Sequence, residues 1–110
     1  MKISSKTPPR TFTVKGVDIS HVADIDLAPD ELITFKTDSG AEYDVARKEW
    51  GFYATPSING RLADMGLRTA LVSNPEGRLY VLLVEPAKMA SFEAYCSEQT
   101  ITIVKWLDEE

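Results

Sequence analysis

The residues with the most useful chemistry lie in a basic and aromatic segment near the middle of the chain. Within fifteen positions, 47–61, the sequence places two arginines, two aromatic residues and an amide, which are Arg47, Trp50, Tyr53, Asn59 and Arg61. Arginine donates forked hydrogen bonds to carboxylates and phosphates, and aromatic faces stack on sugars and bases. The pattern predicts a surface that binds a small anionic or polar ligand, or a partner protein. In the alternative interpretation, Trp50, Phe52 and Tyr53 close the core between a strand and a helix.

Two other groups of polar residues carry weaker signals. Asp24 and Asp26 stand two apart, so on a strand they would share one side and suit a hard cation such as Mg²⁺, although a solvated strand face explains them more simply. His21 lies near Asp18 and Ser20, which are residue types of a hydrolytic triad without its spacing. A partly buried structural histidine is the preferred interpretation. We therefore predict no catalytic residue, no metal site and no cofactor.

Composition narrows the classes of partner and location. The chain has 110 residues, a formal net charge of -5 and a pI near 4.9, which opposes binding to the phosphate backbone of nucleic acids. No stretch has the ~18 consecutive apolar residues of a membrane span, and the N-terminus lacks the apolar region of a signal peptide. We expect a cytoplasmic protein, with neither nucleic acid nor membrane as a partner. Cys96 is the only cysteine, and we expect it in the core.

The elements that must position these residues are organised around the C-terminal half. Leu67–Val72 and Leu79–Val84 flank the turn Asn74-Pro75-Glu76-Gly77, which predicts an antiparallel hairpin. Because the second run is apolar at every position, it predicts a central strand covered on both faces. Pro86 then opens a helix, and a last strand covers 100–107.

The apolar stripe of that C-terminal helix and the tail beyond the last strand complete this half. Met89, Phe92, Tyr95 and Cys96 follow one another at helical spacing, so we expect them to face the sheet. The acidic end, residues 108–110, is expected to fray.

The N-terminal half predicts strands joined by short turns. Residues 1–9 contain Ser, Lys and Pro-Pro and are expected to be flexible. Alternating patterns predict strands within 11–15, 17–27, 33–36 and 41–47. Thr55 and Pro56 can start a short helix that ends at Gly66, although Asn59-Gly60 leaves a loop possible for its first half.

This order of elements predicts an α+β fold of one domain, residues 10–110. The sequence β-α-β-β-α-β from 42 onward is the ferredoxin-like order, here preceded by an N-terminal β-meander. The alternative is one antiparallel sheet with both helices on one face and another strand order. A monomer or a homodimer is compatible with the sequence.

Three segments resemble a family of small bacterial proteins of uncharacterised function. They are Glu42 to Arg47, Trp50 to Ser57 and Gly77 to Glu85. The resemblance implies a compact bacterial domain, and it carries across no activity, cofactor or site residue.

We expect a non-catalytic binding or adaptor module that recognises a protein partner or a small anionic or polar ligand. This role fits a small domain with aromatics beside arginines and no recognisable catalytic constellation. The alternative is a small enzyme, or a subunit of one, that acts on a polar metabolite such as a sugar or nucleotide through Tyr53, Arg47, Arg61 and His21.

Overall fold

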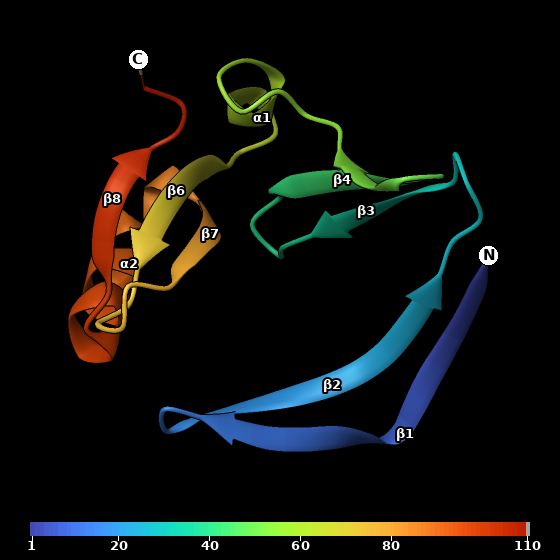
Figure 1. The fold of residues 1–110 in the computed structure, drawn as a ribbon, viewed down its shortest axis with the longest axis horizontal. Helices are drawn as coiled ribbons and strands as arrows, with labels where there is room; N and C mark the ends of the chain where they lie inside the picture. The colour runs from blue at the N-terminus through green and yellow to red at the C-terminus, as the bar shows by residue number, and fades with distance from the viewer. Residues whose placement is uncertain (110) are drawn as a thin grey trace. The chain divides into compact units, whose positions relative to one another are not determined.

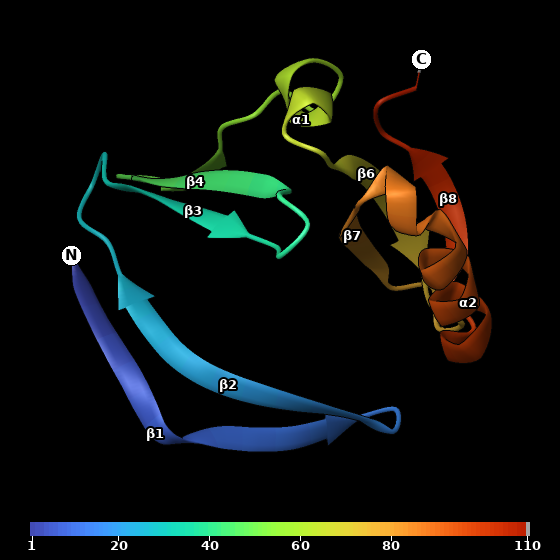
Figure 2. The same ribbon diagram turned by 180° about the vertical axis from the view of Figure 1, so that it is seen from behind.

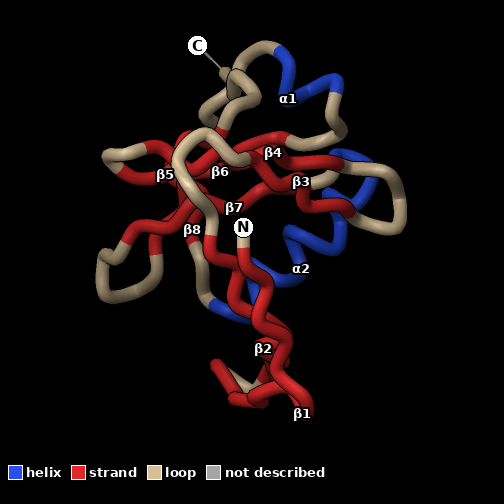
Figure 3. Tube along the Cα trace, turned by 90° about the vertical axis from the view of Figure 1, so that its right-hand side faces the viewer, coloured by secondary structure: helices blue, strands red, loops and turns tan. Residues whose placement is uncertain are grey.

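The computed structural model describes residues 1–109, and in this range it is an α+β fold made mainly of antiparallel strands (Figures 1 and 3). The strands are β1 (Lys2–Val14), β2 (Val17–Asp26), β3 (Leu32–Lys36), β4 (Glu42–Lys48), β5 (Gly51–Ala54), β6 (Arg68–Ser73), β7 (Leu79–Val84) and β8 (Thr102–Trp106). The helices are α1 (Arg61–Asp64), α2 (Met89–Gln99) and a 3-10 turn, Pro86–Lys88, that leads into α2. The strands form three sheets, β1-β2, β3-β4-β5 and β7-β6-β8.

The first two strands form a long antiparallel hairpin. Cross-strand partners run from Lys2 opposite Asp26 to Val14 opposite Val17, and the register shifts between Ser5 and Arg10. β1 bends part-way along its length (Figure 1), as an irregular register requires. Residues 2–9, which the sequence marks as a flexible lead-in, are thus the first part of this strand. Residues 2–5 pair with β2, whereas residues 6–9 fall within the register shift.

The helix expected from Thr55 onward is shorter than its pattern suggested. Only Arg61–Asp64 is helical, and residues 55–60 form turns, as Asn59-Gly60 allowed. The Ser57 hydroxyl accepts a hydrogen bond from the Arg61 N–H at 2.8 Å. The end of the helix is as expected, because Gly66 has φ of +87° and a Cβ there would meet the Ala41 backbone at 3.4 Å.

The C-terminal sheet confirms the β6–β7 hairpin and corrects its position. The order is β7-β6-β8, so β6 is central and β7, predicted to be central, lies at an edge. Leu79, Tyr80 and Val81 of β7 are exposed, whereas Ala70 and Val72 of β6 are fully buried. A strand that is apolar at both odd and even positions does not reveal from its sequence which of its two faces is covered.

Helix α2 covers one face of this sheet (Figure 2). Phe92 and Cys96 of the helix join Val72 and Val84 in the main core cluster, and the Phe92 ring meets Trp106 edge-on at 5.7 Å between centroids. The helical stripe is therefore confirmed, except that Tyr95 is exposed.

The chain separates into two compact units. Unit 1 comprises Met1–Leu32 with Ala46–Tyr53, and unit 2 comprises Ile33–Val45 with the chain from Ala54 onward. Both core clusters belong to unit 2, the second being built on Ala41, Leu62 and Leu67. Among the described residues of unit 1, Leu27 is the single buried large apolar side chain. The prediction of one domain remains a prediction.

The ferredoxin-like order is not confirmed. The strand at 42–48 belongs to the β3-β4-β5 sheet, and β8 pairs with β6. Pairing partners are set by long-range packing of each apolar face, which the order of elements along the chain does not specify.

Candidate functional site

The turn between β4 and β5, together with β5 itself, carries three exposed aromatic residues, which we call the aromatic turn: Trp50, Phe52 and Tyr53. Trp50 occupies the two-residue turn and is 74% exposed, while Phe52 and Tyr53 are 67% and 50% exposed. Successive strand residues point to opposite faces, so Phe52 and Tyr53 lie on opposite faces of β5. Both rings are exposed, so neither face is covered at this point. The interpretation in which these rings close the core is wrong.

Arg47 lies beside the aromatic turn, but its guanidinium is already engaged. It is half-buried and donates a hydrogen bond to the carbonyl of Lys48. The Lys48 ammonium in turn pairs with Asp30 at 2.5 Å, and the backbones of Arg47 and the 30–31 turn exchange hydrogen bonds of 2.6 and 2.9 Å. One of the five guanidinium N–H donors of Arg47 is therefore used inside the chain.

The other two predicted site residues belong to unit 2. Asn59 and Arg61 are exposed, and the Arg61 guanidinium donates to the Thr55 hydroxyl at 3.2 Å. Arg47, Trp50 and Tyr53 belong to unit 1. The structure thus brings together three of the five predicted residues, and a site shared by all five stays a prediction.

A second polar cluster, which sequence reasoning missed, surrounds Glu85 at the end of β7. Its carboxylate accepts hydrogen bonds from the hydroxyls of Ser39 at 2.5 Å and Thr37 at 2.9 Å, and it pairs with Lys88 at 3.2 Å. These hydrogen bonds, that of Ser39 first, lower the pKa of Glu85 below its ordinary value. A hollow of about 360 Å³ adjoins the cluster, lined in part by Asp64 and Lys88. An ionised, saturated carboxylate suits the joining of two turns better than proton transfer.

A neighbouring hollow in unit 2 has a different character. It measures about 380 Å³ and its walls are mainly apolar, built from Phe35, Tyr43, Leu67 and Leu83. Burial raises the pKa of the Tyr43 hydroxyl. The hollow offers shape and mainly apolar contact, with Lys36 and Thr37 as the other polar residues of its lining.

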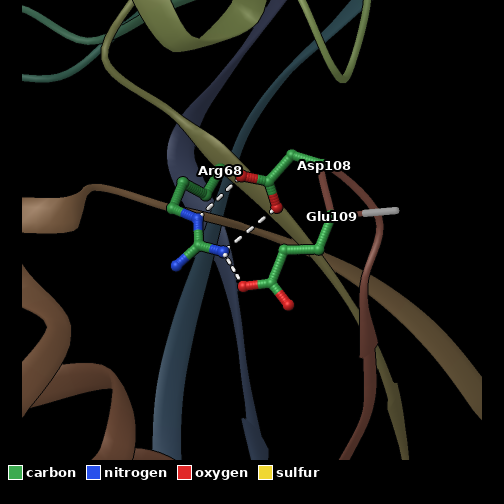
Figure 4. A network of polar contacts seen from close by, with 3 residues as sticks. All are labelled: Arg68, Asp108 and Glu109. Atoms are coloured by element: carbon green, nitrogen blue, oxygen red, sulfur yellow. Dashed lines mark hydrogen bonds and ion pairs between the residues drawn. The ribbon is translucent and has the colours of Figure 1, made fainter.

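The acidic end of the chain is held in place rather than frayed. The Arg68 guanidinium binds Asp108 through two hydrogen bonds of 2.9 and 3.2 Å and Glu109 through one of 3.0 Å (Figure 4). It also lies over the Trp106 ring, 4.1 Å from its centroid. The hydrogen bonds from Arg68 lower the pKa of Asp108. The expectation of a frayed tail is therefore wrong for these residues, and Glu110 lies outside the described residues.

The weaker candidates are accounted for by local pairing. Asp24 binds Lys6 at 3.2 Å and His21 Nε2 at 2.9 Å, and the Lys6 hydrogen bond is the main cause that lowers the pKa of Asp24. Within residues 1–109, no group of three His, Cys, Asp or Glu side chains is placed to hold a metal ion. Cys96 is buried, as predicted, and desolvation raises the pKa of its thiol.

The hairpin of unit 1 presents a further surface that the sequence prediction did not select. Six large apolar residues share one of its faces, and we call this the apolar hairpin face: Ile3, Phe12, Val14, Val17, Ile19 and Ile25. They pair across the strands as Ile3 with Ile25, Phe12 with Ile19 and Val14 with Val17, and all six are exposed. The odd-numbered apolar positions of β2 were the available signal, but alternation alone does not show whether a face is covered.

The longest helix of the described part, α2, has 11 residues, and no helix there has the length and apolar character that crossing a membrane requires. Comparison of the chain with protein-family models, with curated proteins and with solved structures finds no match, and so attaches no function to it.

Proposed function

We propose that this chain is a non-catalytic module that binds a protein partner through the aromatic turn. The observation that carries the proposal is the exposure of Trp50, Phe52 and Tyr53 on one short turn and strand. Tryptophan and tyrosine dominate the energetics of protein interfaces, because they bury a large area at a small entropic cost. As part of the same proposal, the module works in the bacterial cytoplasm.

The charges beside the turn favour a protein over a small anionic ligand. Arg47 is committed to a backbone carbonyl and Lys48 to Asp30. A small anion would have to share these two cations with the groups that they already contact, whereas an apolar side chain of a partner needs only the exposed rings. The partner therefore offers an apolar anchor with a polar surround.

Removal of the rings tests the proposal. In the Trp50→Ala/Phe52→Ala variant, a co-purifying protein should be bound at least ~30-fold more weakly, since one aromatic residue at an interface hot spot contributes about 2 kcal/mol or more. The unfolding free energy should change by less than about 1 kcal/mol, because both rings are solvent-exposed. Quantitative affinity capture and urea denaturation measure the two effects.

Tyr95→Ala is the matched control, since Tyr95 is an exposed aromatic of unit 2, and it should retain the partner. Undiminished capture by the double variant, or its unfolding, would contradict the proposal.

An enzyme acting on a polar metabolite is the second candidate. The hollow beside Glu85, Asp64 and Lys88 supports it, because these side chains offer both signs of charge to a small ligand. Native mass spectrometry of freshly isolated protein distinguishes the two candidates: a bound protein favours the binding module, and a bound metabolite favours the enzyme.

A further inference from the structure

The hairpin β1–β2 is unusual because its apolar side faces solvent. A two-stranded hairpin is at best marginally stable in water unless another layer covers one face. The six side chains of the apolar hairpin face are between 38% and 56% exposed. Unit 1 buries no large apolar residue other than Leu27 among its described residues, so the hairpin lacks a core of its own.

The two faces of the hairpin differ sharply in chemistry. The opposite face carries the cross-strand pairs Thr11 with Ser20 and Thr13 with Asp18, and the Thr13 hydroxyl donates to Asp18 at 2.7 Å. This is the pattern of a strand pair with one wet face and one face that packs. The apolar hairpin face also carries the pair Arg10 with His21, and its six large apolar side chains are exposed.

The size of the apolar hairpin face matches a protein contact. An aromatic side chain buries about 150–250 Å², and Ile and Val bury less, so six side chains at these exposures present at most roughly 500 Å². Two such faces together bury at most about 1,000 Å², the lower limit for a specific interface.

Charge permits a second copy of the hairpin as the occupant and disfavours self-association through the rest of the chain. Residues 1–26 carry four basic and three acidic side chains, a net of +1: Lys2, Lys6, Arg10, Lys15, Asp18, Asp24 and Asp26. The whole chain is -5, so the remainder has a net charge of -6. Two copies that meet through their acidic parts repel each other, whereas two hairpins meet almost without net charge.

We propose that the apolar hairpin face binds the same face of a second copy, forming a two-fold symmetric dimer. Each hairpin then supplies the missing layer of the other, and the contact is isologous, as in most homodimers. Face-to-face packing of the two β1–β2 pairs gives a small four-stranded sandwich. The aromatic turn is not part of this contact, so the dimer is independent of the proposed function.

Charges placed on the apolar hairpin face test the dimer. The full chain should have a mass of twice 12.2 kDa in light scattering. The Phe12→Asp/Ile19→Asp variant should be monomeric, with a dissociation constant raised more than ~100-fold, because each carboxylate would be buried without a partner. Thr11→Asp/Ser20→Asp is the matched control: this neighbouring cross-strand pair lies on the wet face, and the control should remain dimeric.

A second measurement covers the case in which the charged variant fails to fold. In an equal mixture of isotope-labelled and unlabelled wild-type chains, isotope-filtered NMR should detect contacts between copies at the methyl groups of Ile3, Ile19 and Ile25. A wild-type chain that is monomeric, alone or bound through this face to a different protein, overturns the proposal. So does a dimer that shows no such contacts, or one that the folded Phe12→Asp/Ile19→Asp variant preserves.

Discussion

Several polar side chains that the sequence marks as candidate site residues already have partners within the chain. Arg47 has a basic and aromatic neighbourhood that predicts a ligand, yet its guanidinium is used by the carbonyl of Lys48. His21 and Asp24 pair with each other. Trp50 and Phe52, by contrast, are exposed aromatic side chains, and this directs attention from chemistry on ligands to contacts with proteins.

Glu85 gives a test at the residue scale. Its pKa is lowered by the hydroxyls of Ser39 and Thr37, so the stabilisation is present above the ordinary carboxyl pKa and is lost as the pH falls through and below that value. The unfolding free energy of wild type should therefore exceed that of Glu85→Gln most at neutral pH, and the gap should narrow towards pH ~3. Urea denaturation across this range measures the gap.

Glu76→Gln, in the exposed turn before β7, is the control and should change stability little at any pH. A gap for Glu85→Gln that stays constant with pH would mean that the carboxylate has no special role in the folded state.

Residue types alone predicted part of this picture. The burial of Cys96 and the positive φ of Gly66 followed from their positions in apolar and capping patterns. The Glu85 cluster was not predictable, because Thr37 and Ser39 lie more than forty residues away in sequence. The Arg68 contacts with Asp108 and Glu109 have the same cause.

At the scale of elements, local sequence patterns predicted the strands, turns and helix start of the C-terminal half, but they did not predict the order of its strands in the sheet. The β6–β7 hairpin, the start of the helical segment at Pro86 and the last strand are confirmed, because turn chemistry and periodicity are local signals. The central position predicted for β7 was wrong, since strand order depends on contacts that no single segment encodes.

Two valine substitutions test the corrected order. Val72→Ala in the central strand β6 should lower the unfolding free energy by about 1–3 kcal/mol, because the side chain is fully buried and leaves a cavity. Val81→Ala on the edge strand β7 should cost less than about 1 kcal/mol, since that side chain is exposed. Chemical denaturation compares them directly. Equal losses would show that β7 is covered in solution.

At the scale of the whole molecule, the distribution of buried residues predicts uneven stability. Both core clusters lie in unit 2, and regions with few buried apolar contacts open at low free energy. At low protein concentration, the amides of β1 and β2 should exchange with solvent at least ~100-fold faster than those of β6. Hydrogen exchange read by mass spectrometry measures the difference.

Raising the protein concentration should slow exchange in the hairpin if a second copy covers it. Slow exchange of β1 and β2 at the lowest concentration would show that the hairpin is stable without a partner. This outcome would favour the single domain expected from composition.

The position of β8 in the C-terminal sheet affects how the protein is made. β8 pairs with the central strand β6, yet β7 and α2 lie between them in sequence. A growing chain therefore exposes one edge of the sheet that carries the main core cluster until residues 102–106 have been synthesised. Arg68 likewise lacks its carboxylate partners until residues 108 and 109 have been added. The time between synthesis of β6 and synthesis of β8 should therefore govern aggregation of the nascent chain, because one edge of β6 stays unpaired during this time.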